Sequence, residues 1–279
     1  MALTDFSAAI EMATCTDPGR VRSHNEDSVL VNLPCGLAVL ADGMGGYNAG
    51  EVASGMATTV LGSELASAFK ARAPHEVTAR GATWAHEVLV DVIGRTNAAI
   101  HHAAQANPKY AGMGTTLVMV QFFDNRLAVA HVGDSRLYRL RGETLTCMTR
   151  DHSLLQEQID SGMITLEQAR YSMNKNLVTR ALGVETTVDT EVNEYEVLPG
   201  DIYLLCSDGL NDMVEDNEIA MTMSALSANL PLCAMHLVQK ANDNGGRDNV
   251  SVILAKIKGS FPAISASQSR WGRLKSWFK

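Results

Sequence analysis

Short apolar runs recur along this chain, and most of them have the length of one β-strand. Clear runs occupy about 28–33, 36–41, 115–121, 127–132, 136–141, 201–206 and 250–257, and a more polar alternating run lies near 188–197. Apolar runs of this length that end at turn-forming residues are typical of buried strands. The segment 115–148 holds several of them, with turns at 123–125 and 141–143 and no helix between. We therefore expect an antiparallel meander there rather than a parallel, doubly wound sheet.

Two long stretches between the second and third runs instead repeat apolar residues with the period of an α-helix. The stripes consist of Val52, Met56, Val60, Leu61, Leu65 and Phe69 in the first stretch, and of Trp84, Val88, Leu89, Val92, Ile93 and Ile100 in the second. Two later helices are predicted after residue 208, one entered through Glu215-Asp216 and one opened by Pro231 at a favoured first-turn position. Helix pairs that flank stacked antiparallel sheets predict an α+β sandwich.

The stretch 151–183 breaks this pattern, because it is polar and is interrupted by Ser161-Gly162 and by the polar run 171–176. It predicts an insertion beside the functional site. A flap that contacts substrate and a plain surface excursion are equally compatible with its composition.

The end of the chain differs from the body in composition. Residues 259–269 predict a flexible linker, and residues 270–279 are basic and aromatic. Trp271, Leu274, Trp277 and Phe278 would share a helical face opposite Arg273 and Lys275. Such a face suits weak docking on a membrane surface or a partner, whereas a segment this short is marginal as an isolated helix, so a frayed tail is expected as often.

Composition narrows the class of protein. The chain has 279 residues, 46% of them hydrophobic and 19% charged, with a net charge of −8. Such a chain is an ordinary globular protein, and we expect residues 1–258 to form one domain. An acidic balance argues against nucleic-acid binding, which depends on Lys and Arg. The five cysteines form no Cys-x-x-Cys pair, and no apolar stretch is long enough to span a membrane, so we expect a cytoplasmic protein.

Four aspartates each sit where an apolar run breaks into a turn containing glycine or asparagine. They are Asp42, Asp134, Asp208 and Asp248. Carboxylates gathered without cysteine or paired histidine favour a hard, oxygen-seeking cation, so we expect Mn²⁺ or Mg²⁺ rather than zinc or copper.

A charged segment near the N-terminus includes Arg22, Glu26 and Asp27. Alone, such a cluster is most often a solvated turn. The interpretation of this segment changes when it is considered together with the glycine-rich motif that contains Asp42, because both belong to a series of six short motifs along the chain. They are Arg22-x-x-Asn25-Glu26-Asp27, Asp42-Gly43-x-Gly45-Gly46, Gly114-Thr115-Thr116, Gly133-Asp134-Ser135-Arg136, Ser207-Asp208-Gly209 and Asp248-Asn249.

Together these motifs resemble the metal-dependent protein phosphatase family, type 2C. The resemblance covers residues of about 15–257 and extends to Asp151-His152-Ser153 and to 179–183, as found in bacterial members. It implies a four-layer αββα sandwich, two mainly antiparallel sheets flanked by helix pairs, with residues 1–258 as the catalytic domain. It also implies two Mn²⁺ or Mg²⁺ ions at one end of the sheets, with a possible third.

The resemblance also assigns roles to residues. Asp42 would bridge the two ions, and the backbone carbonyl of Gly43 would bind the first. Asp208 and Asp248 would bind the second ion, and Asp134 with Asp208 would complete a third, weaker site.

Within the same resemblance, Glu26 and Asp27 would hold metal waters. Two divalent ions suit phosphate monoester hydrolysis, because they generate a bridging hydroxide near neutral pH and stabilise the phosphoryl oxygens. Arg22 is expected to bind the substrate phosphate through two hydrogen bonds. The alternative is a surface ion pair of Arg22 with Glu26 or Asp27, worth at most about 1 kcal/mol.

Met44 departs from the animal members of the family, which carry a histidine thought to protonate the leaving group. The general acid is therefore open between a metal-bound water and another histidine near the site, with His24 and His152 as candidates. The hydroxyls of Thr115 and Thr116 are expected to tie the backbone rather than to touch substrate.

The leading hypothesis is a cytoplasmic, bacterial serine/threonine protein phosphatase that opposes a protein kinase, acts on phosphorylated proteins and is a monomer. Two alternatives stay open. A catalytically silent, phosphate-sensing module would be expected to lose a bridging or second-ion carboxylate, whereas Asp42, Asp208 and Asp248 are all present. A hydrolase of small phosphate esters is harder to exclude, because a metal centre alone does not choose the leaving group.

Overall fold

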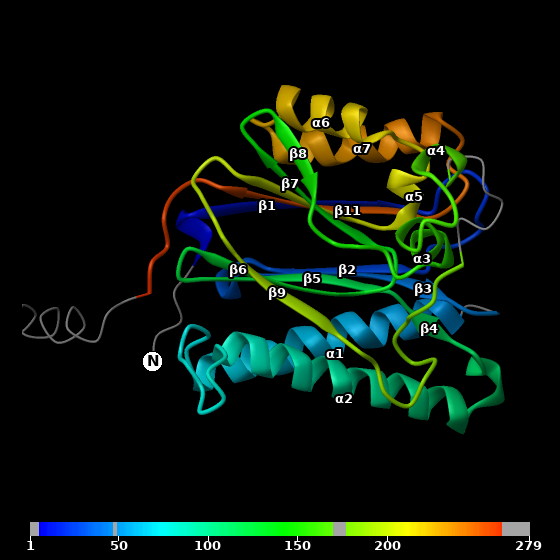
Figure 1. The fold of residues 1–279 in the computed structure, drawn as a ribbon, viewed down its shortest axis with the longest axis horizontal. Helices are drawn as coiled ribbons and strands as arrows, with labels where there is room; N and C mark the ends of the chain where they lie inside the picture. The colour runs from blue at the N-terminus through cyan, green and yellow to red at the C-terminus, as the bar shows by residue number, and fades with distance from the viewer. Residues whose placement is uncertain (1–5, 47–48, 170–176, 264–279) are drawn as a thin grey trace, which may run out of the picture.

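Two antiparallel sheets form the centre of the molecule in the computed structural model, which describes residues 6–46, 49–169 and 177–263 (Figure 1). The first sheet has the order β1 (Ile10–Asp17), β11 (Val250–Ile257), β10 (Ile202–Cys206), β7 (Arg136–Arg141) and β8 (Thr144–Cys147). The second has the order β2 (Asp27–Asn32), β3 (Leu37–Met44), β5 (Leu117–Phe123), β6 (Arg126–Val132) and β9 (Glu191–Glu196), and the short β4 (Gly114–Thr115) pairs with β3. The predicted meander at 115–148 is confirmed, but its β7–β8 hairpin belongs to the first sheet.

Helices cover the outer face of each sheet. Helices α1 (Ala49–Ala71) and α2 (Trp84–Ala106) lie on the second sheet, and α5 (Asp208–Asn211), α6 (Asp216–Ala225) and α7 (Leu230–Asp243) lie on the first (Figure 1). The chain is therefore an α+β protein with the predicted αββα layers. The remaining helices are α3 (Leu154–Asp160), α4 (Leu166–Ala169) and three short 3₁₀ turns, η1 (Phe6–Ala8), η2 (Leu33–Cys35) and η3 (Pro108–Tyr110). No helix in the described part of the chain is long and apolar enough to cross a membrane.

Strand β5 shows why the sequences of the central strands are continuous apolar runs. Alternate side chains of a strand point to opposite faces of its sheet. Leu117 and Met119 therefore pack under α1 and α2, whereas Val118, Val120 and Phe122 pack between the two sheets. Both faces are buried, so every position is apolar except where a polar side chain finds partners, as Gln121 does at the carbonyl of Cys35 (2.7 Å).

The helix predictions are confirmed, with one difference in the buried face of α1. Its innermost positions include Ala49, Ala53 and Ala57, whereas the predicted Val52 and Met56 are only partly buried. Small residues let a helix approach a sheet closely, and they carry little weight in a hydrophobic pattern. Helix α7 begins as predicted, with a proline in its first turn and the Asn229 side chain accepting the amide of Leu232 (3.1 Å).

The described part of the chain continues beyond the last strand, and one residue of this continuation, Phe261, is buried. Phe261 is 5% exposed and makes edge contacts with Phe6 and Phe122 at centroid distances of 5.4 and 6.2 Å. Its amide donates to the Asn125 side chain (2.6 Å). The body therefore extends past Gly259, where the sequence predicts a linker. The predicted basic aromatic helix at 270–279 lies outside the described residues.

The strand pairing brings several strand ends together at one edge of the sandwich. Asp27 opens β2 opposite Asp42 near the end of β3, because these residues are register partners. Strand β6 ends beside Gly133, β10 ends before Asp208, and β11 begins after Asp248. Since neighbouring strands run antiparallel, all these positions fall at the same end of the two sheets. That end is where the site is built.

Candidate metal centre

A cavity of about 210 Å³ opens at this end of the sheets. It is lined by Arg22, Glu26, Asp42, Gly43, Met44, Gly45, Thr116, Asp134, Val178, Asp208 and Asp248. Seven of the eight residues predicted from the sequence therefore line one space. The eighth, Asp27, pairs with Asp42 across the strands and accepts a hydrogen bond from the Ser207 hydroxyl (2.9 Å).

The Asp42 backbone is held by two threonines of the neighbouring segment. The Thr116 hydroxyl accepts the amide of Asp42 (3.2 Å), and the Thr115 hydroxyl donates to its carbonyl (2.8 Å). This confirms that these hydroxyls tie the backbone. The sequence pattern predicted that Asp42 lies at a turn after an apolar run. Instead, strand β3 continues through Met44 by pairing with β4, so Asp42 lies within the strand.

Gly43 is required by the close approach of two other segments. A Cβ at this position would lie 2.6 Å from the carbonyl oxygen of Glu26 and nearer still to that of Gly50. Any larger residue would therefore push the Arg22–Glu26 loop or the start of α1 away from the cavity.

The loop that carries Arg22 and Glu26 is held by a buried asparagine. The Asn249 side chain, 4% exposed, accepts the amide of Glu26 (2.8 Å) and donates to the carbonyls of Pro18 and His24 (3.0 Å each). The sequence motif included Asn249, but its position after Asp248 gave no hint of this role. Three hydrogen bonds from one amide fix an otherwise irregular loop at the cavity.

Arg22 lies at the rim of the cavity with its side chain 52% exposed. Its Nη2 donates to Oδ2 of Asp248 (2.6 Å). The ion pair considered from the sequence, with Glu26 or Asp27, is therefore replaced by one with Asp248.

Burial and mutual repulsion raise the pKa values of the clustered carboxyls. Burial raises the pKa of Asp42 and of Asp208 well above 3.8, and neighbouring aspartates raise both further. Burial likewise raises the pKa of Asp27 to about 6 and of Asp134 to about 6. A metal-free site thus holds its carboxylates under electrostatic strain that bound cations would relieve.

The donor set fits hard divalent cations. Asp27 Oδ1 and Asp208 Oδ1 are buried and have no hydrogen-bond partner among the described residues. Buried carboxylate oxygens without partners are costly unless a cation or water satisfies them. The surrounding groups are carboxylates and the Gly43 carbonyl, which are the ligands that Mn²⁺ and Mg²⁺ prefer.

A second cavity of about 360 Å³ adjoins the first through Asp134 and Asp208. Its walls include Asp212 and several residues of the predicted insertion, among them Leu155, Gln156, Ile159 and Ala169. The insertion thus lies beside the site. Sequence reasoning missed Asp212, although its place four residues after Asp208 on a helical segment could have indicated a shared face.

Met44 and the two histidines considered for proton transfer occupy different places. Met44 lines the cavity, and its thioether has no proton to donate. His24 lies near the rim, with Nε2 3.5 Å from Oε1 of Glu26. His152 is buried and does not line the cavity, so its geometry does not suit proton donation there.

Comparison with known proteins agrees with this geometry. Residues 19–237 match the family model described as Protein phosphatase 2C. The serine/threonine phosphatase Stp of Listeria welshimeri is 37% identical over 246 residues, which cover 86% of this chain and 93% of that protein.

Solved structures give the same result. The serine/threonine phosphatase PstP/Ppp of Mycobacterium tuberculosis superposes with a TM-score of 0.79 at 36% identity, covering 90% of this chain and 100% of that one. A structure of the PstP catalytic domain in complex with two manganese ions gives a TM-score of 0.77 at 36% identity, covering 90% and 99%. This chain therefore belongs to the protein phosphatase 2C family.

Proposed function

We propose that this chain hydrolyses phosphoserine and phosphothreonine in proteins and that the reaction depends on Mn²⁺ or Mg²⁺. The observation that carries the proposal is the convergence of Asp42, Asp134, Asp208 and Asp248 with Arg22 on one cavity. Relatives of similar length are named serine/threonine phosphatases, and a related catalytic domain binds two manganese ions. Residues 1–258 would form the catalytic domain, since the two sheets use strands from Ile10 to Ile257, and the segment that follows adds Phe261 to its body.

Asp42 and the Gly43 carbonyl would hold one ion, and Asp42, Asp208 and Asp248 a second. Asp134 with Asp208 would hold a third, more weakly. When bound, such ions supply hydroxide near neutral pH and stabilise the charge on phosphoryl oxygens.

Protein groups carry the rest of the reaction. Glu26 and Asp27 would accept hydrogen bonds from water in the cavity and so orient it; Glu26 lines the cavity, and Asp27 is the register partner of Asp42. The Arg22 guanidinium has five N–H donors, and its pairing with Asp248 leaves donors for two phosphoryl oxygens. Because Met44 has no proton to give, the leaving alkoxide takes its proton from water in the cavity or from His24 at its rim.

The decisive assay compares phosphate release from phosphothreonine and phosphotyrosine peptides and from a small aryl phosphate. Each substrate is tested with Mn²⁺, with chelator, and with Asp208→Asn. We expect phosphothreonine hydrolysis with Mn²⁺ and at least a hundredfold loss with chelator or with Asp208→Asn, since that carboxylate would serve two ions. Activity that persists in chelator would overturn the metal-dependent mechanism. Silence in every condition would favour a phosphate-sensing module, and hydrolysis of the aryl phosphate alone would favour a small-ester hydrolase.

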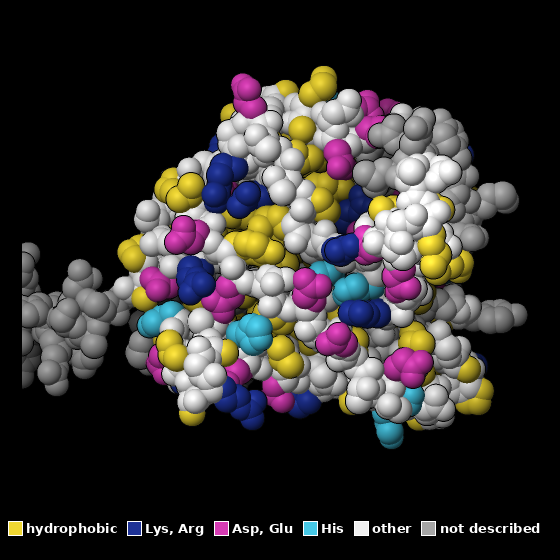
Figure 2. All heavy atoms as spheres, viewed as in Figure 1, with side chains coloured by type: hydrophobic (Ala, Val, Ile, Leu, Met, Phe, Trp, Pro, Cys, Tyr) yellow, Lys and Arg dark blue, Asp and Glu magenta, His cyan; other side chains and the backbone are white. Residues whose placement is uncertain are grey.

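The proposed setting is the cytoplasm, opposite a serine/threonine kinase. All five cysteines are free, as expected in a reducing compartment. The face that carries the edge strands β8 and β9 mixes acidic and basic side chains (Figure 2). Glu191 and Glu196 lie exposed at the two ends of β9 and discourage pairing of this edge with a second copy, which supports a monomer.

A further inference from the structure

The first residues of the insertion are bonded to the turn that carries Asp134. The amide of His152 donates to the carbonyl of Gly133 (2.9 Å), and the amide of Gly133 donates to Nδ1 of the His152 ring (3.1 Å). His152 is 9% exposed, so both bonds are shielded from water. The turn just before Asp134 is thus held by a backbone carbonyl contact and by one side chain.

The hydrogen-bond partners fix the protonation of this ring. An amide N–H can only donate, so Nδ1 of His152 must carry a lone pair. Burial, together with the nearby His131 and Arg180, lowers the pKa of His152 to about 4, so the ring is neutral at neutral pH. Its proton therefore resides on Nε2, which lies 4.0 Å from Oε2 of Glu191.

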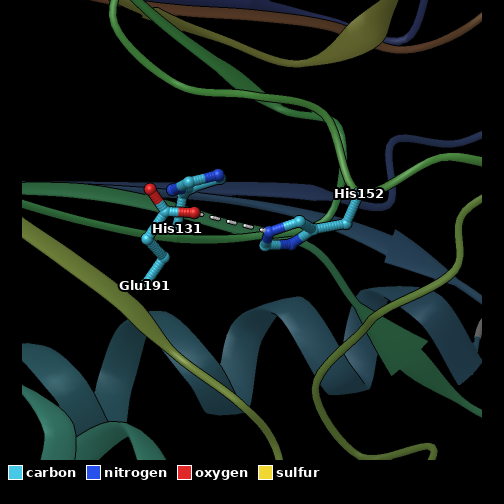
Figure 3. A group of neighbouring side chains, drawn as sticks. All are labelled: His131, His152 and Glu191. Atoms are coloured by element: carbon cyan, nitrogen blue, oxygen red, sulfur yellow. Dashed lines mark ion pairs between the residues drawn. The ribbon is translucent and has the colours of Figure 1, made fainter. Parts of the chain in front are cut away.

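His152 also belongs to a cluster with the donor types of a metal site (Figure 3). One ligand atom from each of His131, His152 and Glu191 lies within 4.8 Å of the others. However, the two rings are stacked, with centroids 4.7 Å apart and planes inclined by 16°. A cation bound in the plane of one ring would lie outside the plane of the other. In addition, Nδ1 of His152 accepts the Gly133 amide and Nε2 carries the proton. The cluster therefore does not suit a cation.

The Gly133 turn leads directly to the metal centre. Gly133 has φ +104°, and a Cβ there would lie 2.7 Å from Thr116. Thr116 in turn bonds the Ser135 hydroxyl (2.7 Å) and the backbone of Asp42. A shift of this turn would therefore move the Asp134 carboxylate relative to Asp42.

A second contact holds the other side of the same turn. Arg136 donates through Nε and Nη2 to both carboxylate oxygens of Asp151 at 2.6 to 3.1 Å. At the far end of the insertion, the amide of Thr179 donates to the carbonyl of His152 (2.8 Å), and Val178 lines the metal cavity. The base of the insertion thus touches the turn on both sides of Asp134.

We propose that His152 is a positioning residue for Asp134. Its neutral ring accepts the Gly133 amide, and this bond sets the place of the Asp134 carboxylate beside Asp208. The inference rests on the proposed function in one respect, since Asp134 is taken as a ligand of the weaker cation site. The contact itself does not depend on that role.

The experiment compares two substitutions that separate the acceptor from the ring. His152→Asn keeps an acceptor near the position of Nδ1 but loses the ring. His152→Phe keeps a ring that stacks on His131 but has no acceptor. Glu191→Gln is the matched control, because it alters the same cluster without touching the acceptor.

The first readout is the hydrogen-exchange rate of the Gly133 amide, which is measured by NMR in the presence of chelator. We expect exchange in His152→Phe to accelerate by about tenfold or more, since a buried amide loses its partner, while His152→Asn and Glu191→Gln stay within about threefold of the wild type. Equal protection in the Phe variant would overturn the contact. Thermal unfolding identifies any variant that fails to fold. If His152→Phe does so, His152→Asn still tests the acceptor, because loss of Gly133 protection in that variant would contradict the proposal.

The second readout is the Mn²⁺ concentration that gives half-maximal phosphopeptide hydrolysis. We expect it to rise about tenfold in His152→Phe, the size of effect seen when a partner of a metal ligand is removed, and to be restored in His152→Asn. Rescue by the phenylalanine instead of the asparagine would show that only ring volume matters and would refute the inference. If no protein hydrolyses the peptide while the exchange pattern holds, the proposed function fails and the contact stands.

Discussion

The charge on Asp134 should destabilise the fold when no cation is bound, and Asp134→Asn tests this directly. Asp134 is 7% exposed, and burial together with Asp151 and Asp212 raises the pKa of its carboxyl to about 6. Asparagine has nearly the same shape and no charge. The substitution should therefore stabilise the metal-free protein.

The size of the effect follows from proton linkage. Between the unfolded and folded pKa values, the folded state binds more protons, so the contribution of this carboxyl to stability falls as the pH rises. With a folded pKa of about 6 and an unfolded value of about 3.9, the cost of the charge is about 3 kcal/mol at pH 8, about 1.5 kcal/mol at pH 5 and about 0.5 kcal/mol at pH 4. The advantage of Asp134→Asn should shrink accordingly on acidification.

Urea unfolding of both proteins in EDTA at pH 8 and pH 5, followed by circular dichroism, measures this difference. Titrating groups that do not interact with Asp134 cancel between the two proteins, whereas Asp42 and Asp208, whose pKa values the Asp134 charge raises, add to the advantage of the variant. Saturating Mn²⁺ should abolish or reverse the advantage at pH 8, because a cation that binds only the native state stabilises the aspartate form. A variant no more stable than the wild type in EDTA at pH 8 would refute the claim that this carboxylate is under strain.

Further substitutions test other parts of the structure. Arg22→Lys should lower kcat/KM for a phosphopeptide by about tenfold or more and Arg22→Ala by about a hundredfold, because a single ammonium cannot replace a two-pronged donor; steady-state kinetics that show no change would place the guanidinium outside the reaction. Gly43→Ala should abolish Mn²⁺ binding measured by calorimetry, since its Cβ overlaps two backbone carbonyls, and normal affinity would contradict the required close approach. Phe261→Ala should cost about 3 kcal/mol in urea unfolding, as expected for a buried aromatic, whereas an exposed linker residue would show no effect.

Much of the fold could be predicted because most strands are buried on both faces. Such strands form uninterrupted apolar runs, and the predicted 28–33 and 250–257 fall within a residue of β2 and β11. Strand β1 was missed because it lies at the edge of its sheet and alternates apolar with polar residues, including Glu11 and Thr14. A single short alternation of this kind is hard to tell from a loop.

The candidate site was predictable for a different reason. An aspartate at the end of an apolar run stands out, and antiparallel pairing gathers such ends at one edge. Supporting residues give no such signal, because their roles arise from contacts between distant segments. Asn249 bonds residues more than two hundred positions away, and the role of His152 depends on which ring nitrogen meets the Gly133 amide.

The pairing of the first and last strands has a consequence for how the protein is made. Strand β1 pairs along its whole length with β11, from Ile10 with Ile257 to Asp17 with Val250. During synthesis, the strand β1 cannot find its neighbour until residues 250–257 have been made, and Asp248 emerges only just before that neighbour. A nascent chain that has not yet released this segment therefore has no complete site, and any hydrolytic activity begins only when β11 is inserted.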